Sequence, residues 1–151
     1  MPILDRKFKS HMKKFFSTAY SQSAFNVATL AIRIVFGFML LYCHGLDKLK
    51  NFSHLQTVFP DPLHIGHRIS FFLAVFAEFL CSILVALGFL TRFAALVLVI
   101  EFCVAGFLVH KGHIPSMNGN WNEQVWLYLA AFFSILMVGP GRISVDGAMG
   151  K

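Results

Sequence analysis

The sequence predicts an all-α fold, an integral membrane bundle of four transmembrane helices with almost no soluble domain. Hydrophobic residues make up 57% of the 151 residues and charged residues only 13%, whereas soluble domains carry roughly 25% charged residues. So few charges cannot cover a water-soluble globule of this size. The apolar residues also gather in long runs, and the 18 phenylalanines suit contact with lipid tails. Composition and the distribution of apolar runs therefore both indicate a membrane protein.

The apolar runs define the predicted helices. A helix needs about 20 largely apolar residues to cross the hydrocarbon, and such runs lie at about 25–44, 69–90, 93–110 and 124–138. They form one membrane domain over 25–147, preceded by a basic segment over 1–24 and followed by a tail over 148–151. The motif Gly139-Pro140-Gly141 ends the last run, because proline and glycine do not continue a helix.

Lysine and arginine placement predicts the orientation. One side of the predicted bundle carries eight such residues and the other carries four, namely Arg6, Lys7, Lys9, Lys13, Lys14, Arg92, Arg142 and Lys151 against Lys48, Lys50, Arg68 and Lys111. Because the more basic side faces the cytoplasm, we expect both termini there, in a multi-pass protein of a bacterial inner membrane. We expect the outer loop to contain a short helix over Phe52–Phe59, followed by the turn Pro60-Asp61-Pro62.

The basic N-terminal segment predicts an interfacial helix. Phe8, Met12, Phe15 and Phe16 recur at helical spacing, with lysines at the positions between them. Such an amphipathic helix lies along a membrane surface. The net charge of +6 is concentrated beside the first span, so anionic lipid, rather than nucleic acid, is the expected partner.

Three ionisable residues interrupt the predicted spans. Arg33, Glu78 and Glu101 lie on three different helices, each roughly 12–17 Å from either helix end at a rise of 1.5 Å per residue. A charge near the midplane costs at least about 2.5–3.5 kcal/mol. We therefore expect the three side chains to face inward and form an intramembrane polar cluster or ligand-binding site.

The polar cluster has two interpretations. It could be a buried ion pair that holds the helices in register. Alternatively, the surplus of carboxyl groups over arginine indicates that one carboxyl holds a proton, or that a bound cation or substrate completes the site.

Polar residues also gather at the predicted outer mouth of the bundle. The candidates there are His44, Asp47, Lys48, His110, His113 and Glu123. A metal site formed by His44, His110 and His113 is one interpretation, and histidines that bond headgroups or loop carbonyls are the other. The three cysteines form no CxxC motif, which argues against a dithiol enzyme.

The order and spacing of several short motifs resemble the DoxX family of small four-span membrane proteins. The matching residues are Arg33-x3-Gly37-x7-Gly45-x2-Lys48-Leu49, Ala77-Glu78, Leu87-Gly88-x2-Thr91-Arg92 and Gly139-Pro140-Gly141-x2-Ser144-x-Asp146. The resemblance covers nearly everything from Arg33 to Asp146. It implies a four-helix membrane bundle and, for some relatives, a subunit of a thiosulfate:quinone oxidoreductase or a link to redox or metal stress.

Several functions therefore stay open. The first is a redox- or stress-associated membrane component that binds a quinone or small polar ligand and works with a soluble or membrane partner enzyme. Any enzymatic activity would be that of a quinone-linked oxidoreductase subunit. The alternatives are a non-catalytic scaffold or chaperone and, less favoured, a transporter of a small solute or metal ion. The glycine and alanine faces would permit a homodimer.

Overall fold

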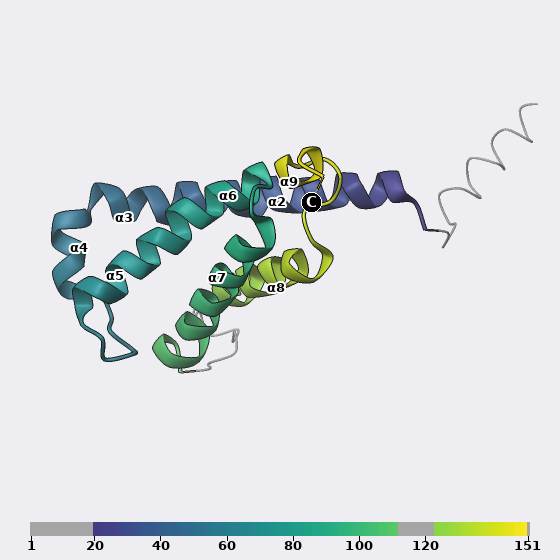
Figure 1. Cartoon of the computed structure of the whole chain (residues 1–151). Helices are drawn as coiled ribbons and strands as arrows, with labels where there is room; N and C mark the ends of the chain where they lie inside the picture. Colours follow the sequence, from purple (N-terminus) through teal and green to yellow (C-terminus); the bar gives the residue numbers. More distant parts are fainter. Residues whose placement is uncertain (1–19, 112–122, 151) are drawn as a thin grey trace, which may run out of the picture.

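The computed structural model describes residues 20–111 and 123–150, and these residues form helices and turns with no strand (Figure 1). Three helical stretches are long and apolar enough to cross a membrane, at Gln22–Lys50, His67–Leu87 and Thr91–Val109. The fourth apolar helix, Glu123–Val138, has 16 residues and is shorter than a typical span. The predicted all-α class is confirmed. The predicted interfacial helix falls mostly on residues 1–19, outside the described part.

The first long helix extends beyond its predicted end near residue 44. It comprises α2 (Gln22–Leu40), the π-helical segment η1 (Leu41–Gly45) and α3 (Leu46–Lys50). No proline interrupts this stretch, and a single wide π-turn accommodates the sequence without ending the helix. The consequence is that Lys48 belongs to the long helix instead of a loop beyond it.

A short helix, α4 (Phe52–Val58), then joins the first long helix to the second. The ring of Phe52 packs edge-on against Phe71 and Phe72, with centroids 5.2 and 5.4 Å apart, and Phe59 also contacts Phe71. The predicted short helix is confirmed, one residue shorter than expected. The turn after it lies slightly later than predicted, where the His64 amide donates to the Asp61 carbonyl oxygen.

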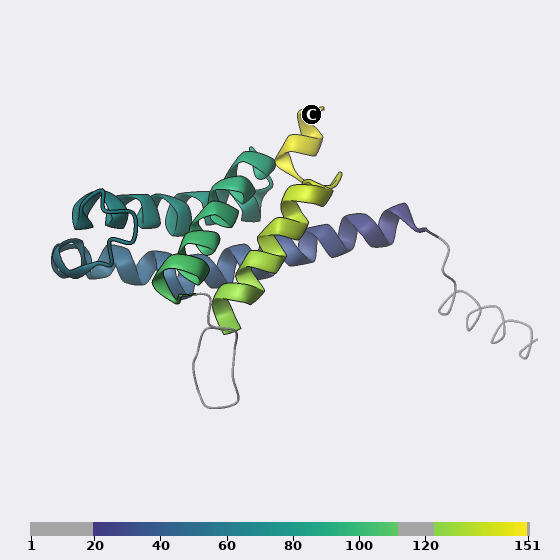
Figure 2. The same ribbon diagram turned by 90° about the horizontal axis from the view of Figure 1, so that it is seen from below.

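The second long helix runs antiparallel beside the first (Figures 1 and 2). It comprises α5 (His67–Val75), η2 (Phe76–Cys81) and α6 (Ser82–Leu87). Two glycines of the first helix allow the close approach. A Cβ at Gly37 would lie 3.0 Å from the Ser82 carbonyl oxygen, and one at Gly45 would lie 2.6 Å from that of Glu78. The register therefore places Gly45 opposite Glu78.

The remaining helices cross this pair and pack against each other (Figure 2). They are α7 (Thr91–Cys103), continued by η3 (Val104–Val109), and α8 (Glu123–Val138). The rings of Phe102, Tyr128 and Phe132 stack between them, with centroids 5.2 Å apart for the first two and 6.0 Å apart for the last two. These rings form the centre of a core that also contains Leu98 and Ile135.

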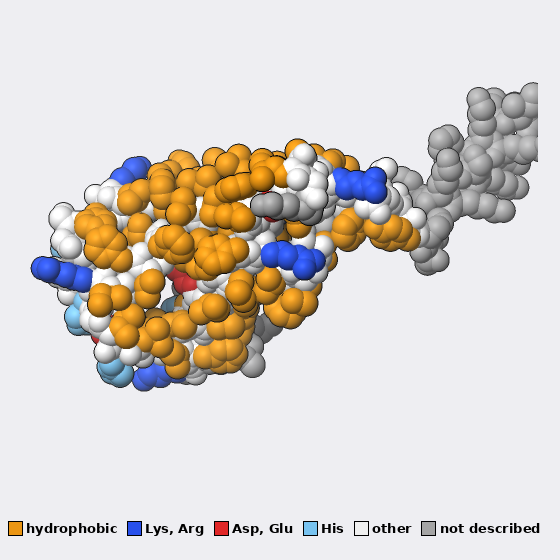
Figure 3. All heavy atoms as spheres, in the orientation of Figure 1, with side chains coloured by type: hydrophobic (Ala, Val, Ile, Leu, Met, Phe, Trp, Pro, Cys, Tyr) orange, Lys and Arg blue, Asp and Glu red, His pale blue; other side chains and the backbone are white. Residues whose placement is uncertain are grey.

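The chain after α8 folds back onto the turn between α6 and α7. Following Gly139-Pro140-Gly141, the one-turn helix α9 (Val145–Ala148) lies beside that turn. Below, the "Gly88 end" denotes the part of the bundle containing Gly88 and α9, and the "Lys48 end" the part containing Lys48 and α4. Much of the surface between these ends is hydrophobic (Figure 3), as expected for helices that face lipid.

Candidate functional site

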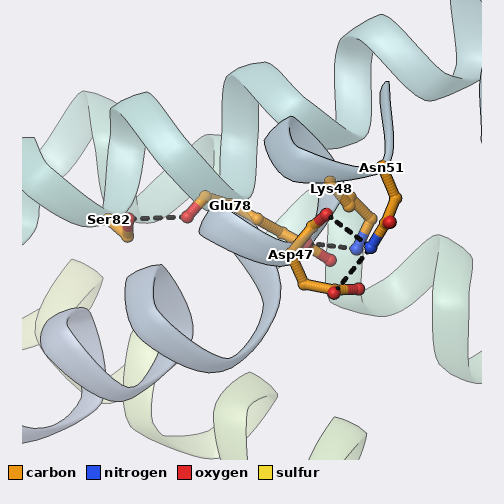
Figure 4. Close-up of polar contacts among 5 residues, drawn as sticks. All are labelled: Asp47, Lys48, Asn51, Glu78 and Ser82. Atoms are coloured by element: carbon orange, nitrogen blue, oxygen red, sulfur yellow. Dashed lines mark hydrogen bonds and ion pairs between the residues drawn. The ribbon is translucent and has the colours of Figure 1, made fainter. Parts of the chain in front are cut away.

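One polar cluster lies toward the Lys48 end and consists of Lys48, Glu78 and Glu101, which we call the carboxyl cluster. The Lys48 ammonium forms an ion pair with the Glu78 carboxylate, and these side chains are only 15% and 12% exposed (Figure 4). The Glu101 side chain, from α7, lies close enough to Glu78 and Lys48 for their charges to act on its carboxyl group. Three separate helices thus bring one lysine and two carboxyl groups together.

The backbone around Glu78 explains how the carboxyl cluster is held. Glu78 lies in the π-helical segment η2, where the normal helical hydrogen-bond ladder is altered. The Ser82 hydroxyl donates to the carbonyl oxygens of Glu78 and Phe79, at 2.6 and 2.8 Å. Gly45, in the π-segment η1, packs directly against the Glu78 backbone. π-Turns are frequent at functional sites, and here two of them meet at one residue.

The carboxyl cluster places two carboxyl groups beside one lysine. Two ionised carboxylates offer only acceptors and repel each other, whereas a protonated one can donate to the other. With Lys48 charged, one proton on the two carboxyl groups would leave the cluster electrically neutral. The Glu101 Oε2 atom is buried and has no hydrogen-bond partner among the described residues. Glu101 can therefore still accept one further hydrogen bond at this atom.

Aromatic residues border the carboxyl cluster. Tyr128 is close enough to Glu78 for the carboxylate charge to act on its hydroxyl, and the rings of His44 and Phe36 pack edge-on against Tyr128, with centroids 5.9 and 6.0 Å away. Figure 3 shows acidic atoms at a hollow in the hydrophobic surface, on the side between α5–α6 and α7. An acidic side chain is therefore visible from this side of the bundle.

A second polar group, the arginine network, lies at the Gly88 end and consists of Arg33, Gly88, Thr91 and Asp146. Arg33 is completely buried, and its Nη2 donates to the Ile143 carbonyl oxygen. The Asp146 carboxylate accepts from the backbone of Leu90 at 3.0 Å, and from the backbone and hydroxyl of Thr91 at 2.9 Å each. Its negative charge also acts on Arg33. Asp146 therefore caps α7 from a distant part of the chain.

We expected Arg33 to form one cluster with Glu78 and Glu101, but in the structure Arg33 lies apart from both. Gly45 packs on Glu78, and Gly45 lies 12 residues after Arg33 in the sequence, which is about 18 Å along a helix. The sequence-based depths assumed that the first helix ends near residue 44. Because it continues to Lys50, Arg33 lies toward the Gly88 end and Lys48 takes the expected place of the arginine.

The other predicted mouth residues do not form a metal site in the described part of the chain, where no three His, Cys, Asp or Glu side chains could hold one ion. His44 packs on Tyr128. Asp47 is exposed and accepts a 2.9 Å bond from the Asn51 side chain. Glu123 is exposed at the start of α8, and His110 follows η3. His113 lies outside the described residues.

Two pairings were missed by sequence reasoning, namely Lys48 with Glu78 and Asp146 with Arg33. All four residues stand in the motifs quoted above, so the residues were visible but their partners were not. Ser82 and Asn26 are further buried polar residues with specific roles. Asn26 Oδ1 accepts from the backbone of Arg142, at 3.2 Å, which ties the segment after α8 to the first helix.

Three helical stretches are long and apolar enough to cross a membrane, and their buried faces carry two separate polar groups. These features are those of a helical membrane protein. The sequence model of the DoxX family matches residues 28–111, which is more than half of the chain. The protein belongs to the DoxX family. Two uncharacterized proteins of Haemophilus influenzae are similar to it. One is 29% identical over 71% of this chain and 74% of the relative. The other is 30% identical over 80% of this chain and 89% of the relative. No solved structure matches significantly.

Proposed function

We propose that this DoxX protein is a redox-associated component of a bacterial inner membrane, in which the carboxyl cluster binds the headgroup of a lipid-soluble quinone. The observation that carries the proposal is the largely buried Lys48–Glu78 ion pair with the Glu101 carboxyl group close to it, next to a hollow in the apolar surface. A ligand dissolved in the bilayer would reach these groups from the side, without crossing water.

The chemistry of the carboxyl cluster suits a quinone. A quinone carbonyl oxygen accepts hydrogen bonds, and Lys48 and a protonated carboxyl group are donors. Reduction of a quinone to a quinol takes up two electrons and two protons. Glu78 and Glu101 would pass two protons, taken up in turn from water, to the two ring oxygens. A partner enzyme would supply the two electrons, since the described residues contain no recognisable electron-carrying motif.

The proposal is tested by quinone retention in protein purified from bacterial membranes. We expect the wild type to carry quinone, and Glu101→Gln and Lys48→Met to lose most of it. Glu123→Gln and Lys50→Met, which change the same residue types at exposed positions, should retain it. Wild-type protein that carries only phospholipid, with no quinone, would falsify this function.

The topology is part of the same proposal. We propose four crossings, with Glu123–Val138 as the fourth, and both termini in the cytoplasm. The basic residues Arg92 and Arg142 at the Gly88 end support this orientation. An alkaline phosphatase fused to the C-terminus should be inactive, because the enzyme needs the periplasm to form its disulfides. An active fusion would show that the C-terminus is periplasmic, so that either the orientation or the number of crossings differs from this proposal.

A non-catalytic scaffold is the second candidate, and the arginine network favours it. Arg33 and Asp146 join α2, the α6–α7 turn and the chain after α8, which is a purely structural arrangement. In a scaffold, the carboxyl cluster would also serve only stability. Glu78→Gln and Glu101→Gln would then lower the melting temperature without changing quinone retention per folded molecule.

A further inference from the structure

A shallow groove of about 160 Å³ lies at the Gly88 end, between the first half of α2 and the end of α8. Its lining is almost wholly apolar and includes Phe25, Ala28, Ile32, Ile135, Val138 and Gly139. The hydroxyls of Thr29 and Ser134 also line it, but each donates to a backbone carbonyl of its own helix. The groove therefore offers dispersion contacts and very few free polar groups, which suits a hydrocarbon chain.

The side chain of Arg92 and the backbone of Arg142 lie at the Gly139 end of the groove. A Cβ at Gly139 would lie 3.4 Å from Arg92 Nε and Nη2, so the guanidinium group lies directly against this part of the lining. Arg142 follows on the same turn, and its backbone is tied to Asn26 on α2. Both arginines are exposed, and basic side chains are visible beside the turn after α8 (Figure 3).

We propose that the groove binds one acyl chain of an anionic phospholipid, whose phosphate is bound by Arg92, while Arg142 adds positive charge to the same end of the bundle. Guanidinium groups bind phosphate through paired hydrogen bonds, and the apolar lining covers the attached chain. The Gly88 end faces the cytoplasm in the proposed topology, on the side where anionic lipids are abundant. This lipid site is separate from the carboxyl cluster and goes beyond the proposed quinone function.

The size and charge of the groove favour a lipid over a second copy of the chain. A stable protein interface takes roughly 20–30 residues from each partner, whereas eight described residues line this groove. A second copy would also bring its own arginines to the same basic region, where like charges repel. An anionic headgroup removes that repulsion.

The test is native mass spectrometry of the full chain, loaded with phosphatidylglycerol or phosphatidylcholine of identical acyl chains. We expect one phosphatidylglycerol to stay bound per chain, and phosphatidylcholine to be retained at least about tenfold less. The double variant Arg92→Gln/Arg142→Gln should lower phosphatidylglycerol retention to the phosphatidylcholine level. Ala28→Phe, which fills the groove from an exposed position, should reduce the retention of both lipids.

Matched variants separate this site from general lipid contact. Ala31→Phe changes an exposed alanine on the same helix outside the groove, and Arg68→Gln removes an exposed arginine at the Lys48 end. Both should retain lipid like the wild type, and helical content by circular dichroism should be unchanged in every variant. Equal retention of the two lipids, full retention by Ala28→Phe, or a dimer that Ala28→Phe dissociates would each overturn the proposal.

Discussion

Gly88 lies so close to Arg33 that a Cβ at position 88 would be 1.9 Å from the arginine Nη1 atom. Gly88 also has a φ of +73° as it ends α6. The buried guanidinium group therefore occupies the space that a side chain at position 88 would need. Turn geometry and arginine packing thus require glycine at the same position, which links the end of the second helix to the middle of the first.

This relationship predicts a large cost for Gly88→Ala. A left-handed non-glycine residue costs about 1–2 kcal/mol, and displacement of the packed neighbours should add roughly 1–3 kcal/mol. Gly150→Ala is the matched control, because Gly150 has a φ of +71° and no neighbour within 4 Å of an added Cβ. Denaturant unfolding in detergent should show a much larger loss for Gly88→Ala. Equal losses would mean that backbone strain alone makes glycine necessary.

Asp146→Asn should weaken the whole Gly88 end. The carboxylate accepts three hydrogen bonds from Leu90 and Thr91. In asparagine an NH₂ group replaces one carboxylate oxygen, so it would face the N–H or O–H groups that now donate to that oxygen. We expect a loss of roughly 2–4 kcal/mol in the free energy of unfolding. Asp47→Asn, at an exposed aspartate, should cost little. A neutral effect of Asp146→Asn would show that the cap on α7 is dispensable.

Lys48→Met should destabilise the Lys48 end by roughly 2–4 kcal/mol, because it leaves a largely buried carboxylate without its counter-ion. The double variant Lys48→Met/Glu78→Gln should recover part of the loss, since both charges are then removed. A double-mutant cycle on thermal unfolding measures this coupling. Strictly additive effects would show that the ion pair contributes nothing to stability.

Asp61 should make the loop before α5 sensitive to acid. Desolvation is the largest single influence and raises the pKa of its carboxyl group. Hydrogen bonds from Ser70, Gly66 and Ile65 and the charge of His67 together outweigh it, so the pKa lies below the ordinary value of 3.8. Since the folded pKa is lowered, the stabilisation is present above the unfolded value and is lost as the pH falls through the folded pKa.

The measurement is an NMR titration of the Gly66 amide, which donates to Asp61 at 2.7 Å. Its chemical shift should titrate with a midpoint below 3.8, and Asp61→Asn should abolish the transition. A midpoint at or above 3.8 in the wild type would contradict the lowered pKa.

Much of the fold was predictable because it depends on local sequence. Apolar runs of sufficient length produced the helices, the spacing of Phe52, Leu55 and Val58 produced α4, and Gly139-Pro140-Gly141 ended α8. The buried face of the first helix, with Thr29, Arg33 and Gly37, also follows from helical periodicity. These features need no knowledge of a neighbouring helix.

The sequence by itself determined the helical membrane class and the residues that turn inward, but the tertiary structure decided which charges meet. Periodicity defines the face of a helix on which Arg33 or Glu78 lies, yet their relative depth depends on where each helix ends and on the register between helices. The contact of Gly45 with Glu78 sets that register. It pairs Glu78 with Lys48 and leaves Arg33 with Asp146. A distance of a few helical turns is longer than any side chain, so Arg33 cannot reach Glu78.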